Sequence, residues 1–146
     1  MNIRHRNIIL LVIFAFLVTR YAYVTYLTPD LVPAGRVNEN IQEAYRRQLS
    51  NIQVEGVGTI VKTLADDTEG SRHQRFLITI APGHTVLIAH NIDIATRISG
   101  LEPGTDIAFF GEYEWNDKGG LVHWTHHDPQ RKHVDGWLRY RGRTYQ

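Results

Sequence analysis

From residue 52 onwards, apolar residues of this chain alternate with polar ones in short runs separated by turn-forming residues. The runs cover residues 52–64, 73–80, 84–90, 106–115 and 121–125. A period of two places successive side chains on opposite faces of a β-strand, so each run predicts a strand with one buried face. "APG" (81–83) and "NDKGG" (116–120) fit hairpin loops between neighbouring runs. The sequence therefore predicts a mainly β domain with five strands.

The order of the runs favours one type of β fold. Residues 91–105, "NIDIATRISGLEPGT", fit a short helix or turn between the third and fourth strands. This is the order of the five-stranded oligonucleotide/oligosaccharide-binding (OB) barrel. Gly56 and Gly58 interrupt the first run and predict a bulge or strong coil, which a small barrel needs in its first strand. We predict a small OB-like barrel, although the strand spacing equally fits an SH3-like barrel or a small sandwich.

An amphipathic helix is predicted before the barrel. Apolar residues recur at every fourth position from Val37 to Leu49, with acidic residues early in the segment and basic residues late. Its apolar stripe is expected to pack on the barrel. At the other end of the chain, residues 131–145 fit a final solvated hairpin with Gly142 in its turn.

The N-terminus predicts export of the rest of the chain. "MNIRHRN" is basic, residues 8–18 are eleven consecutive apolar residues, and residues 8–27 are long enough to span a membrane. A cleaved signal peptide also fits, but no pair of small residues directly follows Val18, which favours an uncleaved anchor. We predict an anchor or signal at 1–27, a proline-containing linker at 28–36, and an extracytoplasmic domain at 37–146.

Charge and composition exclude several functions. Residues 1–34 carry three of the 16 basic and one of the 15 acidic residues, which leaves 13 basic and 14 acidic residues in the remainder. Such a balanced domain lacks the positive field that non-specific nucleic-acid binding requires, so nucleic acid is disfavoured as a partner. The chain has no cysteine, which excludes disulfides, thiolate zinc sites and a cysteine nucleophile.

The segment "HWTHHD" (123–128) is the densest group of potentially functional side chains. Strand alternation places His73 and Arg75 outward, because Phe76 and its apolar neighbours must face the core. His90 ends the partner strand of that hairpin and is expected within reach of them. The candidate ligand-binding residues are Arg72, His73, Arg75, His90, Trp124, His126 and His127. We also expect His126 to belong to a polar cluster with His73 or His90.

Several chemistries fit these residues. Aromatic rings, imidazoles and arginines could bind a sugar, a nucleotide or another anionic ligand. His126 and Asp128, two apart and about 7 Å from each other on a strand, could share a divalent metal ion for binding or hydrolysis. "HWT" also fits one H-x-[ST] element of metal-free phosphodiester chemistry, but a second copy is absent.

Structural roles compete with these functions. Asp128 precedes Pro129 and could cap the following turn, and Trp124 could serve hairpin packing. Binding of a small polar or anionic ligand leads among the functions, with a cell-envelope interaction scaffold as the first alternative and a metal-assisted hydrolase as the second.

A set of motifs resembles a family of small bacterial proteins of unknown function. These motifs are "GSRHQRF" (70–76), "LIAHNID" (87–93), "GEYEWNDKGG" (111–120), "HWTHHDP" (123–129) and the C-terminal "GWLRYRGRTYQ". The resemblance runs from about residue 52 to residue 146 and implies the fold and an extracytoplasmic location in bacteria, with no established activity. We therefore expect a single-pass protein of the bacterial inner membrane with its C-terminal domain in the periplasm, or a secreted protein if the segment is cleaved. The membrane and either a small polar ligand or an envelope protein are the expected partners.

Overall fold

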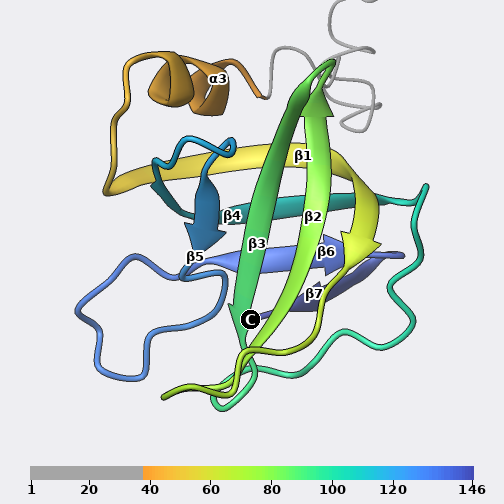
Figure 1. Ribbon diagram of the computed structural model, residues 1–146. Coiled ribbons are helices and arrows are strands. Elements are labelled where there is room, and N and C mark those ends of the chain that lie inside the picture. Colours follow the sequence, from red (N-terminus) through yellow and green to blue (C-terminus); the bar gives the residue numbers. More distant parts are fainter. Residues whose placement is uncertain (1–37) are drawn as a thin grey trace, which may run out of the picture. The chain divides into compact units, whose positions relative to one another are not determined.

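The computed structural model describes residues 38–146 (Figure 1). In this part of the chain a helix, α3 (Glu39–Arg46), precedes seven strands. The strands are β1 (Ile52–Thr63), β2 (His73–Ala81), β3 (His84–Asn91), β4 (Asp106–Glu114), β5 (Leu121–His123), β6 (Trp137–Tyr140) and β7 (Arg143–Tyr145). All five predicted strands are present, and so is the final hairpin around Gly142.

The predictions for residues 1–27 and 28–36 lie outside the described residues, as does Val37. Within residues 38–146, no helix is both long and apolar enough to cross a membrane.

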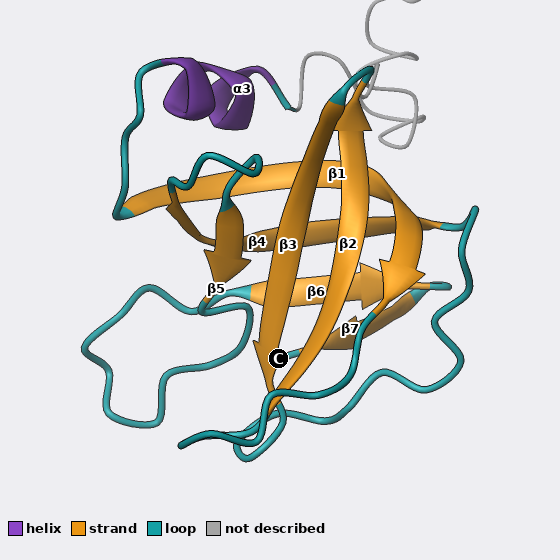
Figure 2. Ribbon diagram, viewed as in Figure 1, coloured by secondary structure: helices purple, strands orange, loops and turns teal. Residues whose placement is uncertain are grey.

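The first five strands close into a mixed β-barrel (Figure 2). Their order is β1-β2-β3-β5-β4, and β4 pairs again with β1. The β3–β5 pair is parallel, whereas the other pairs in the ring are antiparallel. The β6–β7 hairpin extends the sheet beside β4. The mainly β prediction is confirmed, and so is a barrel of five strands preceded by a short helix.

The helix predicted between the third and fourth strands is wrong. After β3 the chain makes one turn, in which the amide of Ala95 donates to the carbonyl of Asn91. It then runs without regular structure past Ile98, which is buried in the core. The side-chain amide of Gln74 donates to the carbonyl of Ile98 over 2.8 Å and accepts from its amide over 2.9 Å. A tertiary contact thus satisfies the backbone groups that a helix would otherwise pair.

Strand alternation correctly predicts which side chains of β2 face the core. Gln74, Phe76 and Ile78 are buried, whereas His73 and Arg75 are only partly buried on the opposite face.

Helix α3 buries Ile41 and Ala44 against the barrel, as its apolar stripe predicts, but ends at Arg46, earlier than expected.

Gly56 and Gly58 do not form the bulge that the sequence suggests. Both lie in the regular ladder of β1 with β4, and the irregularity in the pairing of β1 with β2 falls between Ile60 and Lys62. A Cβ atom on Gly56 would lie 2.4 Å from the ring of Phe109 and 2.6 Å from Oδ1 of Asn38. Gly56 is therefore required for close packing.

Asn38 joins helix α3 to the edge of β1. Its side-chain Nδ2 donates to the carbonyl of Val57 over 2.7 Å and to that of Ile80 over 2.8 Å, while Oδ1 accepts from the amide of Val57 over 3.0 Å. These backbone groups lie where β1 has left β2 to pair with β4. The fully buried Asn38 side chain replaces the missing strand partner.

Replacing Asn38 with alanine should lower the free energy of unfolding by about 2–4 kcal/mol, because it leaves buried backbone groups without partners. Asn40, which is exposed on the same helix, provides the matched control. Asn40→Ala should change the free energy by less than about 0.5 kcal/mol. Urea denaturation of both variants measures the difference, and equal effects would contradict the role of Asn38.

Candidate functional site

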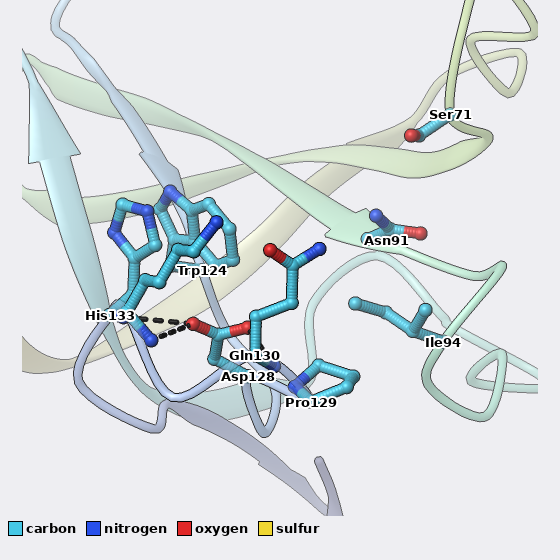
Figure 3. A pocket seen from close by; sticks show the side chains of 9 residues that line it. Ser71, Asn91, Ile94, Trp124, Asp128, Pro129, Gln130 and His133 are labelled. Carbon is cyan, nitrogen blue, oxygen red and sulfur yellow. Dashed lines mark hydrogen bonds between the residues drawn. The ribbon is translucent and has the colours of Figure 1, made fainter.

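Asp128 organises the loop that follows β5. Strand β5 ends at His123, and Trp124 adopts a left-handed backbone with φ of 48°, so most of "HWTHHD" lies outside the strand. Oδ1 of Asp128 accepts from the amide of Gln130 over 2.9 Å, and Oδ2 accepts from the amides of Lys132 and His133 (Figure 3). The amide of Gln130 is the main cause that lowers the pKa of Asp128. The alternative that Asp128 caps the following turn is therefore confirmed.

A cleft of about 560 Å³ opens between this loop and the ends of two strands. Figure 3 shows Trp124, His133 and Gln130 across from Ser71, Asn91 and Ile94. The loop also contributes Asp128, Pro129 and Lys132 to its lining. A smaller cleft of about 280 Å³ shares Ser71, Asn91, Ile94 and Trp124 and adds His73, His123 and His126. The two clefts share four lining residues, and together we call them the Trp124 cleft.

Trp124 is held by imidazole rings of the same loop. The ring of His133 stacks on it, with centroids 3.7 Å apart and planes inclined by 15°. The centroid of the His126 ring is 5.5 Å from that of Trp124. The indole is thus fixed in one orientation at the wall of the cleft, which reduces the entropy lost when a ligand contacts it.

His90 lies in the barrel interior behind the cleft. Its Nε2 is 3.3 Å from the carbonyl of Thr96, to which it must donate, so Nδ1 is free to accept from the hydroxyl of Thr125 over 2.9 Å. Burial lowers the pKa of His90 to about 4, which keeps the ring neutral. The His90 and His126 ring centroids are 6.2 Å apart. His126 thus belongs to a polar cluster with His90, as expected.

The structure brings together only some of the predicted ligand-binding residues. His73, Trp124 and His126 line the Trp124 cleft. The residues outside its lining are Arg72, Arg75, His90 and His127. His90 does not share the outward face of His73 and Arg75, because it pairs with Gln74, which faces the core.

Three of the four residues outside the cleft lining interact with other groups of the protein. Arg72 forms an ion pair with Asp93 over 2.7 Å, and the side chain of Arg75 donates to the carbonyl of Ala65 over 3.1 Å. His127 lies 3.0 Å from a carboxylate oxygen of Asp135. A ligand-binding role for these residues stays a prediction without support from the cleft's geometry.

His126 and Asp128, which were predicted to share a metal ion, lie in the loop after β5 and not on a strand. Both carboxylate oxygens of Asp128 accept backbone hydrogen bonds, and Nδ1 of His126 donates to the carbonyl of His127 over 2.7 Å. Thr125, the hydroxyl residue of "HWT", binds His90 instead of a group in the cleft.

Sequence reasoning missed a second cluster on β4 and β5. Glu112 and Glu114 are two apart on β4, and Glu112 pairs in register with His123. Nε2 of His123 lies 3.6 Å from Glu112 Oε1 and 3.8 Å from Glu114 Oε1. Both glutamates are partly buried. The spacing in "GEYEW" was the available signal, since alternate residues of a strand share a face.

These observations define a small β-barrel protein with a polar surface cleft built by one capped loop. The chain belongs to the protein family of unknown function DUF3465, whose model matches residues 24–146. The predicted resemblance to a family of unknown function is thus confirmed, and it begins further upstream than residue 52. Comparison with curated proteins found no match.

Because the pKa of His90 is lowered, the folded protein should lose stability at acidic pH. In the unfolded chain a histidine has a pKa of about 6.5, so between pH 6.5 and 4 the unfolded state binds a proton that the folded state does not. Stability should therefore fall by about 3 kcal/mol from pH 7 to pH 4 through this residue. His90→Gln should flatten the pH dependence by that amount in urea denaturation. Identical slopes for both proteins would contradict the prediction.

Proposed function

We propose that this protein binds a small anionic ligand that carries a polar or aromatic ring in the Trp124 cleft. The observation that carries the proposal is the combination of a fixed aromatic wall, Trp124 stacked with His133, and the Lys132 side chain in one cleft. Its volume of about 560 Å³ lies in the range of small-molecule sites. Asn91 and Gln130 add amide groups that can donate to ligand oxygens.

Charge in the cleft favours an anion. No carboxylate within residues 38–146 pairs with Lys132. Among the described residues, Asp128 is the only carboxylate in the lining of either cleft, and three backbone amides donate to its oxygens. These bonds offset the repulsion that its charge would exert on an anionic ligand.

The barrel order supports an OB-like fold as part of the proposal. Closure of β1-β2-β3-β5-β4 with a parallel β3–β5 pair is the arrangement expected of that fold. OB-like barrels often bind ligands on their β2–β3 side, and Ser71, His73 and Asn91 bring the ends of these strands into the cleft. The missing helix between β3 and β4 is a departure from the pattern.

The same surface supports a role as an envelope interaction scaffold less well than it supports ligand binding. The large apolar side chains that are exposed in the described part of the chain are Val61, Ile94 and Val134. They come from three separate segments, and one of them, Ile94, lines the cleft. A concave site with aromatic and polar walls favours a small ligand over a flat apolar partner surface.

We also propose that the domain acts outside the cytoplasm of a bacterium, tethered to the inner membrane by residues 1–27. The support is the sequence alone: a basic start, a long apolar run and the position of this run before the domain.

Adenosine monophosphate (AMP) is a suitable probe because it joins an aromatic ring to a phosphate. Titration followed by NMR should shift the Trp124 indole signal and the amides of Gln130 and Lys132. Inorganic phosphate and adenosine, each with half of the recognition groups, should bind more weakly. Lys132→Gln should weaken AMP binding about fivefold, as expected for the loss of about 1 kcal/mol from one exposed charge contact.

Lys118→Gln is the matched control, since Lys118 is exposed in the β4–β5 loop and lies outside the cleft. Its affinity for AMP should equal that of the wild type. The proposal fails if AMP shifts no cleft signal at millimolar concentration, or if both lysine variants weaken binding equally.

Alkaline phosphatase fused after Gln146 tests the location. The fusion should be active, because Arg4 and Arg6 hold the N-terminus inside and the C-terminus is exported. A fusion that lacks residues 1–27 should be inactive. Activity of both fusions, or of neither, would contradict the membrane proposal.

A further inference from the structure

We propose that Glu112, Glu114 and His123 bind a divalent transition-metal ion, with Zn²⁺ as the best fit. The three side chains come from the paired strands β4 and β5, so the backbone fixes their relative positions. One donor atom of each lies within 4.8 Å of the others. The proposal is independent of the AMP-type ligand, because none of the AMP contacts named above involves these three side chains.

The distances between the three side chains fit coordination of one ion. Nε2 of His123 stands 3.6 Å from Glu112 Oε1 and 3.8 Å from Glu114 Oε1, beyond the length of a hydrogen bond. In a tetrahedral site with bonds of about 2.1 Å, two ligand atoms stand about 3.4 Å apart. Small side-chain shifts would therefore bring all three donors onto one ion.

The unpaired nitrogen of His123 is a second observation that points to a ligand. Its Nε2 atom is buried and has no hydrogen-bond partner in the described part of the chain. A buried nitrogen without a partner is costly, and coordination of a cation would satisfy it. Burial lowers the pKa of His123, and the charges of Glu112 and Glu114 oppose that shift.

Neighbouring side chains support the same arrangement. Nε2 of Gln53 donates to Glu112 Oε2 over 3.3 Å, which orients the carboxylate from outside as partners of metal ligands commonly do. Nδ1 of His133 is 3.9 Å from the same oxygen. Two carboxylates and one imidazole form a borderline ligand set that suits Zn²⁺, and they leave a fourth position for water.

Isothermal titration of the untagged full-length protein in detergent with Zn²⁺ tests the proposal. We expect one Zn²⁺ per chain with micromolar affinity. Glu114→Gln and His123→Gln should each weaken binding by at least about 10–100-fold, the cost known for loss of even an outer partner of a metal ligand. Glu69→Gln, at an exposed position outside the cluster, is the matched control and should bind as the wild type does.

Glu114→Gln keeps the test decisive if His123→Gln fails to fold. The Glu114 carboxylate accepts no hydrogen bond within the described residues and is close to isosteric with glutamine, so this variant should melt at the temperature of the metal-free wild type. Absence of stoichiometric Zn²⁺ binding by the wild type would overturn the proposal. Equal affinity of Glu114→Gln and the wild type would overturn it as well.

Discussion

The double pairing of β1 is the constraint on which the rest of the structure depends. Residues 52–59 of this strand pair with β4, and residues 59–63 pair with β2, so one strand closes the barrel. Closure separates β1 from β2 near Val57, and the Asn38 side chain satisfies the exposed backbone groups there. Gly56 makes room for both Asn38 and Phe109. Closure also sets β5 parallel to β3, which brings the loop after β5 beside the ends of β2 and β3.

The shape of the Trp124 cleft depends on that position of the loop after β5 and on the carboxylate of Asp128. Without Asp128, the amides of residues 130, 132 and 133 would need other partners, and the loop would lose its shape. The same loop stacks His133 on Trp124. Asp128 therefore shapes the cleft through the backbone of the loop.

Strand positions could be predicted from the sequence because one-sided burial leaves a direct period-two signal, as in β2. The face of β3 on which His90 lies could not be predicted from the sequence. Both Ile88 and Leu87 are apolar, so either set of alternate residues could face the core. Its burial depends on the register with Gln74. The loop at Ile98 was missed for a similar reason, because Gln74 replaces helical hydrogen bonds with tertiary ones. Glu112 and His123 meet only through the β4–β5 register, which spacing within either run does not reveal.

The two proposed sites are electrostatically linked through neighbouring residues. His123 lines the smaller part of the Trp124 cleft while its Nε2 faces two carboxylates. A neutral imidazole leaves these carboxylates uncompensated, and their field opposes an anion nearby. A divalent ion would offset both charges and leave Lys132 and Asp128 as the charged side chains in the lining of the larger cleft. Metal and anionic ligand should therefore bind with positive coupling, and by linkage each must raise the affinity of the other by the same factor.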